Sequence, residues 1–345
     1  MNKRALFLVA VFVFSVGWTI RELPTLPGGG LSSANGVNEY GQVAGQAQSA
    51  AGIMRAVFWD GAGVIYEIPT PAIAGKISVA EDVNDYGYVV GRMGTATSNA
   101  NAFFWYPGSL TNLGAATESR AFAINNYNDV AGQWTVAGTP WRYYAVVWGG
   151  ATPGSPYFLG GWGGWIDFAS DIADTAPVVA GTAALQSPRY RHAFLWVSGS
   201  GMRDLGTLGG NNSFGRALSV GMWPDPLGET IYVTGESETV PGSMNASPFL
   251  WHRGFMMNIG LLPGCTTGWG FGINKNKDVV GSCWGGGIDR AFLWKSGVLI
   301  DLNSVLPAGS GWERLHAAYD INESGQIVGY GTYKGAGRGF ILSPW

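Results

Sequence analysis

Charged residues are scarce in this 345-residue chain. Asp, Glu, Lys and Arg make up 12% of it, about half the usual share of roughly 25% in soluble proteins. No stretch of the sequence gathers basic residues into a stripe, which argues against a nucleic-acid partner. Hydrophobic residues make up 46%, enough for a large core.

Motifs of catalysis and metal binding are also missing. The three histidines, His192, His252 and His316, are far apart in the sequence and lack the spacing of metal ligands. No GxSxG, HExxH or P-loop pattern is present. The sequence therefore predicts no catalytic residue, no metal and no cofactor, and we expect a protein that is not an enzyme.

Cysteine is limited to Cys265 and Cys283. Two cysteines do not supply the four ligands of a structural zinc site, but in an exported chain they can form one disulfide. They flank a predicted hairpin. If Ile273 faces Asp278 across it, the cysteines are about three residues out of register. The sequence leaves this pair as a possible disulfide.

The first 17 residues have the pattern of a secretory signal peptide. Lys3 and Arg4 precede an apolar run, and Ser15 and Gly17 are small residues before a possible cleavage point. The run is short for a membrane span, although a retained anchor is the alternative. We expect an extracellular or cell-surface protein, with the periplasm as the other possible location, and no stable membrane span after cleavage.

One unit recurs along the rest of the chain. Its first element is Ala, three residues, Asn, and then a glycine seven residues later, as in "ANGVNEYGQVAG" (34–45). The closing glycines are Gly45, Gly91, Gly132, Gly181, Gly235, Gly281 and Gly329. They are about 47 residues apart, a period typical of propellers and other repeat folds.

Two further elements belong to the unit. A segment such as "AFLW" (193–196) occurs seven times, and a segment such as "RDLGTLGG" (203–210) follows it six times. The seventh copy of this last element, "RELPTLPGGG" (21–30), stands at the beginning of the chain.

Each unit thus offers four short segments, rich in β-branched and aromatic residues and bounded by Gly, Asn and Asp. Periodic stretches of helical length are absent outside the leader. The pattern predicts an all-β fold, a seven-bladed β-propeller of four-stranded antiparallel blades. The small residue four before each Asn position (Ala34 in the first copy, Ala217 in the fifth) favours the first segment as the innermost strand, and Pro24 and Pro69 favour the fourth as the outermost.

The N-terminal segment 21–27 then completes the last blade, in a single domain over 18–345. The predicted repeats are 31–71, 72–118, 119–164, 165–210, 211–264, 265–309 and 310–345. Because the fourth and fifth copies are degenerate, six or eight blades stay open.

The combined motif "RHAFLWVSGSGMRDLGTLGG" (191–210), with "INESGQIVG" (321–329), resembles the HAF-repeat family of extracellular repeat proteins. The family is named after the tripeptide that stands here as His192-Ala193-Phe194. The resemblance implies export and a propeller-like β fold, and it brings no catalytic residues. This chain keeps the histidine only once, which argues against a general role for it.

Tryptophan gives the most information about function. Six of the 16 tryptophans end an "AFLW"-type segment and are predicted to pack between blades. The others fall mostly in connections that emerge on one face of a propeller. The binding candidates are Trp134, Trp141, Tyr143, Trp162, Trp165, Tyr190, Trp269, Trp284, Trp312 and Tyr333. Aromatic side chains on a surface suit stacking on sugars or anchoring a partner, while packing between blades is the alternative.

Three carboxylates share one place in the repeat: Asp82, Asp171 and Asp320. They could line the channel and hold a cation or act as an acid–base pair. We favour hydrogen bonding to nearby backbone N–H groups, because the other copies have Gly, Ala or Ser there.

Two other recurrent residues have structural explanations. The recurrent Asn fits an Asx turn at the hairpin. Arg55, Arg290 and Arg338 precede the third segment, and we expect solvated or backbone-bonded strand starts rather than an anion site.

These observations predict a secreted, non-enzymatic binding or assembly module. Its partners would be other copies of itself, surface proteins or extracellular glycans. A carbohydrate-binding lectin, and a hydrolase or lyase with its site at the channel mouth, are the alternatives.

Overall fold

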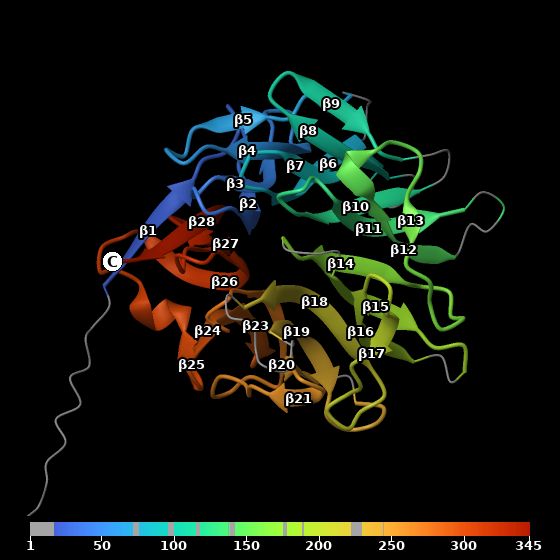
Figure 1. Cartoon of the computed structure of the whole chain (residues 1–345). Coiled ribbons are helices and arrows are strands. Elements are labelled where there is room, and N and C mark those ends of the chain that lie inside the picture. Colours follow the sequence, from blue (N-terminus) through green and yellow to red (C-terminus); the bar gives the residue numbers. More distant parts are fainter. Residues whose placement is uncertain are drawn as a thin grey trace, which may run out of the picture.

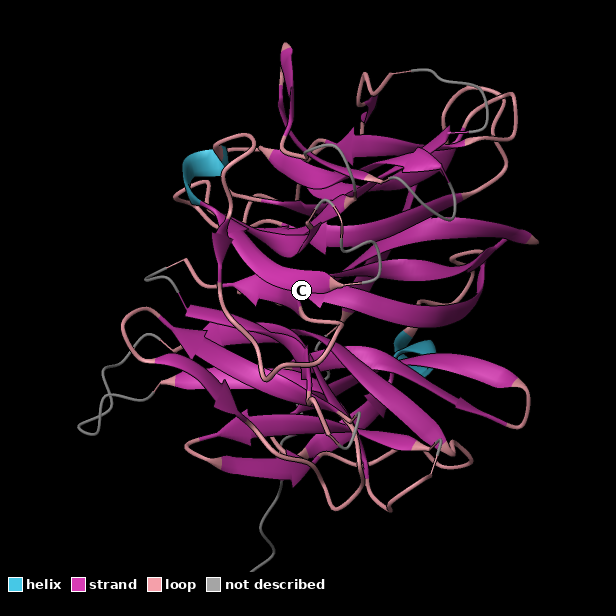
Figure 2. Cartoon of the chain, turned by 90° about the vertical axis from the view of Figure 1, so that its right-hand side faces the viewer, coloured by secondary structure: helices cyan, strands magenta, loops and turns pink. Residues whose placement is uncertain are grey.

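The computed structural model describes residues 17–71, 76–95, 100–114, 118–136, 138, 142–174, 178–187, 190–221, 230–243 and 245–345. Seven four-stranded antiparallel sheets are arranged as blades around one axis (Figure 1). The side view shows the depth of the blades and the connections at their two ends (Figure 2). The leader up to residue 16 and Trp141 lie outside the described residues.

The strands follow the chain from the innermost to the outermost in each blade, and blade 7 takes its outer strand from the N-terminus. Blades 1 to 3 contain β2 (Ser32–Val37), β3 (Val43–Gln48), β4 (Met54–Trp59), β5 (Ile65–Glu67); β6 (Lys76–Val83), β7 (Val89–Thr95), β8 (Asn101–Tyr106), β9 (Ser109–Asn112); and β10 (Ser119–Ile124), β11 (Val130–Thr135), β12 (Tyr143–Trp148), β13 (Tyr157–Phe158). Blades 4 and 5 contain β14 (Phe168–Ile172), β15 (Val178–Ala184), β16 (Arg191–Val197), β17 (Gly201–Asp204); and β18 (Ser213–Val220), β19 (Ile231–Glu238), β20 (Ala246–His252), β21 (Phe255–Asn258). Blades 6 and 7 contain β22 (Thr267–Ile273), β23 (Val279–Gly285), β24 (Ile288–Lys295), β25 (Val298–Asp301); and β26 (Trp312–Ile321), β27 (Ile327–Tyr333), β28 (Ala336–Pro344), β1 (Trp18–Leu23). Two 3-10 turns are η1 (Gly149–Ala151) and η2 (Leu302–Val305).

The ring closes through the N-terminal strand, as the sequence predicts. Strand β1 pairs antiparallel with β28, from Trp18 opposite Pro344 to Leu23 opposite Gly339. In Figure 1 the blue β1 lies beside the red β28. The Ser32 hydroxyl donates to the carbonyl of Leu23 at 2.8 Å and ties this strand to the first blade. The all-β, seven-bladed fold class is confirmed.

The hydrophobic core is divided among the junctions between blades. Seven clusters of buried residues each join two neighbouring blades, and the one that joins blade 7 to blade 1 contains Leu23, Trp59 and Val328. The six third-strand tryptophans are all buried, as predicted: Trp59, Trp105, Trp148, Trp196, Trp251 and Trp294. Stability therefore depends on every blade having two neighbours, which only a closed ring provides.

The closing glycines are required by close packing within each blade. A Cβ on Gly45 would lie 2.1 Å from the Ser33 carbonyl oxygen of the inner strand and 2.9 Å from the Trp59 ring. Equivalent clashes with the inner strand occur at the other six positions. The repeated glycine thus lets an aromatic ring of the third strand cross over the second.

Each inner strand carries a β-bulge at the same place. In blade 5 the bulge lies between Gly215 and Ala217, so Gly215 is the equivalent of Ala34 in blade 1. The sequence alignment placed Ala217 there and was wrong by two residues. The extra residues before Gly235 in this copy conceal the register.

The cysteines form the disulfide that the sequence left open, with Cα atoms 5.9 Å apart. Cys283 lies opposite Gly268, so the pair is three residues out of register, as expected. The chain before β22 turns at Leu262–Cys265, through a hydrogen bond from the Cys265 N–H to the Leu262 carbonyl. The turn brings Cys265 back beside β23, where it reaches Cys283. Within the described residues, no helix has the length and apolar character of a membrane span.

Candidate functional site: the axial channel

The bulge turns one side chain of every inner strand into the central channel. A bulge residue is not paired in the ladder and re-aims its side chain. The seven channel residues placed this way are Asn35, Glu81, Phe122, Ser170, Arg216, Phe271 and Tyr319. Their chemistry differs from blade to blade, whereas the residue before each of them is always Ala or Gly. We call these seven the bulge ring.

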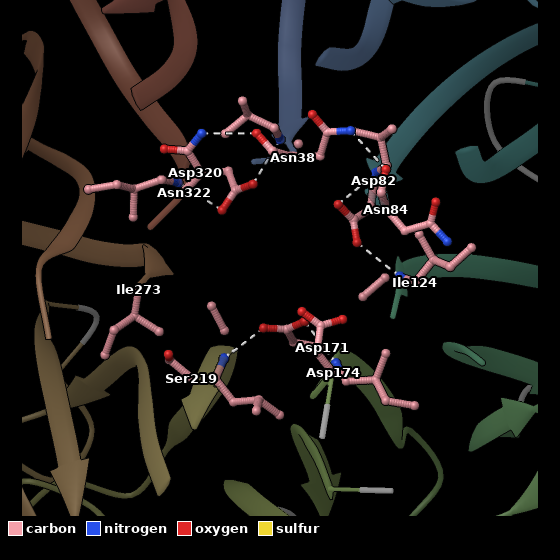
Figure 3. Close-up of a pocket in the computed structure, with 18 of the residues that line it drawn as sticks. Asn38, Asp82, Asn84, Ile124, Asp171, Asp174, Ser219, Ile273, Asp320 and Asn322 are labelled. Atoms are coloured by element: carbon pink, nitrogen blue, oxygen red, sulfur yellow. Dashed lines mark hydrogen bonds between the residues drawn. The ribbon is translucent and has the colours of Figure 1, made fainter. Parts of the chain in front are cut away.

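The channel has two ends of different character. The turn end lies at the hairpins between first and second strands, and the loop end lies on the opposite side. Asp82, Asp171 and Asp320 follow the bulge ring toward the turn end and point into the channel (Figure 3).

Each of these aspartates joins two blades. One oxygen of Asp320 accepts from the N–H of Ile321 at 2.8 Å, and the other from the N–H of Val37 in the next blade at 2.9 Å. Asp82 bonds the N–H of Ile124 in the same way. Asp171 bonds the N–H of Leu218 at 2.7 Å. The favoured prediction, a carboxylate bonded to backbone N–H groups, is therefore correct.

Steric clashes would prevent two neighbouring blades from both carrying such an aspartate. A Cβ on Gly36 would lie 2.7 Å from the Asp82 carboxylate, and a Cβ on Gly272 would lie 2.9 Å from the Asp320 Cα. A blade next to an aspartate therefore carries a small residue. Because seven is odd, the alternation fails once, where Ala217 of blade 5 and Gly272 of blade 6 are neighbours.

The buried position of these carboxyls favours their protonated form. Burial raises the pKa of Asp171 to about 7 and that of Asp320 to about 6. The pKa of Asp82 is raised well above its usual value by burial and by the negative charges of Asp320 and Asp171. Low polarity and like charges both disfavour ionisation.

The recurrent Asn forms a second set of bridges at the turn end. The Asn38 Oδ1 accepts from the N–H groups of Tyr40 and Gln42, which is the predicted Asx turn. Its Nδ2 donates to the carbonyl of Asn84 in the next blade at 2.9 Å. Asn322 closes the set by donating to the carbonyl of Asn38. The polar groups of the turn end therefore hold the blades together.

The loop end contains a cavity of about 470 Å³. Besides the bulge ring, its lining includes Arg120, Gln133 and Phe168. Its size falls in the range of small-molecule sites, roughly 300–1,000 Å³.

Two aromatic pairs form opposite walls of this cavity. Phe122 and Phe168 of blades 3 and 4 have ring centroids 6.2 Å apart, and Phe271 and Tyr319 of blades 6 and 7 have centroids 5.5 Å apart. Blades 3 and 4 lie across the channel from blades 6 and 7 (Figure 1). Burial raises the pKa of the Tyr319 hydroxyl, which is therefore neutral at physiological pH.

Each charged residue of the cavity forms an ion pair with a residue of opposite charge that does not itself line the cavity. Glu81 pairs with Arg92 at 2.7 Å, and Arg120 pairs with Glu118 at 2.7 Å. Arg216 pairs with Glu236, which is only 3% exposed. The charges of these lining residues are therefore balanced by the charges of their partners.

Gln133 is the exception to this pairing. Gln133 is 7% exposed and lines the cavity. Within the described part of the chain, its side-chain amide makes no hydrogen bond. Because Gln133 lines the cavity, its amide is available to a ligand.

The aromatic candidates from the sequence lie elsewhere. Trp134 and Trp312 are each 8% exposed and pack between blades. Trp165 and Trp284 are exposed by 59% and 43%. The half-buried candidates are Tyr143, Trp162, Tyr190, Trp269 and Tyr333. Trp141 lies outside the described residues, and none of the described candidates lines the channel cavities.

The three arginines lie inside the third strands, near their starts, and form structural ion pairs. Each also donates to a backbone carbonyl, as expected. Arg55 pairs with Glu67, Arg290 with Asp301 and Arg338 with Glu22, each joining the third strand to the fourth. His192 takes the same place in blade 4, with its Nδ1 2.8 Å from Asp204. The Asp204 carboxylate raises the pKa of His192. Within the described residues, no group of three or more His, Cys, Asp or Glu could hold a metal ion.

Sequence reasoning identified Asp82, Asp171 and Asp320 but missed the bulge ring. A signal was present. Within the "A-x-[GAD]-[VI]-N" element, the residue x varies in charge, size and aromaticity while its neighbours repeat. Such variation inside a constant framework is expected where side chains serve a ligand rather than the scaffold.

Comparisons with known proteins show the fold alone. No known family profile and no curated protein sequence matches this chain. Among solved structures, it is similar to the β-propeller domain of the Trilobed protease from Pyrococcus furiosus, with 10% identity, a TM-score of 0.52 and coverage of 91% of this chain and 93% of that one. A structure of prolyl endopeptidases gives 10% identity, a TM-score of 0.54 and coverage of 91% and 50%.

TolB from Acinetobacter baumannii gives 11% identity and a TM-score of 0.46, with coverage of 88% of this chain and 63% of TolB. The chain thus spans about half the length of the endopeptidases and less than two thirds of that TolB. What the chain has in common with these structures is the β-propeller fold.

Proposed function

We propose that this protein is a non-enzymatic binding module whose ligand site is the loop end of the axial channel. The observation that supports this most is the bulge ring. Seven equivalent positions carry seven side chains of mixed chemistry around one cavity of about 470 Å³. A scaffold requirement would repeat one residue type, as it does at the closing glycines.

The carboxylates of the turn end support a structural assignment rather than a catalytic one. The oxygens of Asp82, Asp171 and Asp320 accept backbone N–H groups within and between blades. A general acid or base needs its carboxyl within reach of the substrate. These three are already engaged in holding the ring.

We propose that the protein acts outside the cytoplasm. The disulfide between Cys265 and Cys283 supports this, because disulfides persist mainly in oxidising compartments. The signal-like leader and the resemblance to the HAF-repeat family agree with it.

An assembly role is the second candidate function. Exposed Trp165 and Trp284 favour it, since large aromatics at the surface often anchor a protein partner. Further copies of this chain, or other surface proteins, would then cover these residues.

Thermal shift measurements test the channel proposal. The panel contains neutral methyl pyranosides, glucuronate, amino acids and nucleosides at millimolar concentration. We expect at least one class to raise the Tm of the wild type, because a ligand that binds only the folded state stabilises it. The same class should have no effect on a Phe271→Ala/Tyr319→Ala variant that keeps its fold. Equal shifts in both proteins, or no shift with any class, would contradict the proposal.

A further inference from the structure

The loop-end cavity contains chemistry that selects among small ligands, and this inference rests on the proposed function. The two aromatic pairs, Phe122 with Phe168 and Phe271 with Tyr319, leave a slot between opposite walls. Aromatic faces favour a flat or ring-shaped ligand with apolar C–H surface. A saturated sugar ring and an aromatic heterocycle both meet this requirement.

The polar groups between the walls narrow the choice. The Gln133 amide offers a donor and an acceptor, and the Tyr319 hydroxyl offers both in one atom. Asn35 uses its Nδ2 to donate to the Ala80 carbonyl at 2.9 Å, which leaves its Oδ1 as an acceptor. Ser170 donates to the Gly215 carbonyl at 2.8 Å, and its oxygen can still accept. Groups of this kind match hydroxyls, which both donate and accept.

The charges of the cavity disfavour an ionic ligand. Glu81, Arg120 and Arg216 already have partners of opposite charge within 3 Å, so a charged ligand would find no excess charge to pair with. Taking an ion out of water without such a partner is costly. Neutral hydroxyls can still bond to the free faces of these side chains.

We infer that the cavity binds one neutral pyranose ring of a carbohydrate, held between the aromatic walls with a hydroxyl bonded to the Gln133 amide. Gln133 tests this ligand most directly, because it lines the cavity and its amide makes no hydrogen bond to the described residues. In blade 1 the equivalent residue is Gln46, which pairs with Ala56 of the third strand and does not line the cavity. This residue provides a matched control.

Isothermal titration calorimetry of the full chain tests the inference with methyl α-D-glucopyranoside, methyl α-D-galactopyranoside and methyl α-D-mannopyranoside. Sodium glucuronate and adenosine serve as the charged and aromatic comparisons. We expect one of the neutral pyranosides to bind best, and Gln133→Ala to weaken it roughly tenfold, since a buried hydrogen bond is lost. Gln46→Ala should leave the affinity unchanged.

Two failures can be told apart. If glucuronate or adenosine binds best and Gln133→Ala or Phe271→Ala weakens that binding, the channel is a ligand site and the sugar inference is wrong. If a pyranoside binds the wild type and Gln133→Ala and Phe271→Ala equally well, or if nothing in the panel binds, both the inference and the channel proposal are overturned.

Discussion

The carboxylate of Asp320 in the last blade accepts a hydrogen bond from the backbone N–H of Val37 in the first, at 2.9 Å and 283 positions away in sequence. This contact closes the ring on its inner side, while β1 closes it on its outer side. Both closures depend on parts of the chain that are far apart. The stability of each blade is therefore linked to the integrity of the whole ring.

The Asp320 bridge should be measurable in the free energy of unfolding. Asp320→Ala leaves the N–H groups of Val37 and Ile321 without their acceptor, and we expect a loss of about 2 kcal/mol. Urea unfolding followed by tryptophan fluorescence gives the value. Asp289→Ala, at an exposed position of β24, is the control and should change little. Equal losses in the two variants would show that the bridge contributes nothing.

The outer closure predicts a large difference between Leu23 in β1 and Leu31 just before β2. Leu23 is completely buried at the junction of blades 7 and 1, whereas Leu31 is 41% exposed. Leu23→Ala should cost about 2–5 kcal/mol, and Leu31→Ala less than about 0.5 kcal/mol. Deletion of 21–27 should lower the Tm far more than Leu31→Ala. If the deletion hardly moved the Tm, ring closure by β1 would not matter for stability.

Stability should fall as the pH rises. The pKa values of Asp82, Asp171 and Asp320 are raised in the folded protein, so these groups bind protons more tightly there than in the unfolded chain. Their contribution to stability is complete below the unfolded pKa and is lost as the pH rises through the folded values. The window set by Asp320 and Asp171 runs from about 4 to about 7.

Differential scanning calorimetry at pH 5 and pH 8 measures this effect. We expect the higher Tm at pH 5, and a smaller difference between the two pH values in Asp171→Asn, which cannot ionise. A Tm that rises from pH 5 to pH 8 would be inconsistent with the burial of these carboxyls.

The disulfide should stabilise blade 6. Cys265 and Cys283 are 18 positions apart, and a crosslink that closes such a loop contributes about 3 kcal/mol through the unfolded chain. Dithiothreitol should therefore lower the Tm of the wild type and leave that of Cys265→Ser/Cys283→Ser unchanged. A Tm of the wild type that is insensitive to dithiothreitol, under conditions where thiol titration shows full reduction, would contradict this role.

The architecture could be predicted from the sequence because the residues that determine it are local and repeated. The closing glycine, the Asn of the hairpin and the aromatic third strand each recur in a fixed order. The displaced "RELPTLPGGG" element predicted where the ring closes. In blade 5, however, the extra residues before Gly235 hid the register, and only the observed pairing of Gly215 with Gly235 restores it.

The candidate site was harder to predict from the sequence, for a physical reason. A bulge adds one residue to the inner strand and breaks the alternation of its two faces. The side on which Phe271 or Tyr319 points therefore does not follow from periodicity. Trp134 and Trp312 were expected in connections, but β11 and β26 extend far enough to include them, and they pack between blades.

The most direct test of the account asks which part of the molecule binds. Retention of the purified full chain on cell-envelope preparations and on a glycan array is compared for wild type, Phe271→Ala/Tyr319→Ala in the channel and Trp165→Ala/Trp284→Ala on the surface. Circular dichroism confirms that each variant is folded. We expect the channel variant to lose retention on both supports and the surface variant to keep it. Retention that survives the channel substitutions but is abolished by the surface substitutions would contradict it.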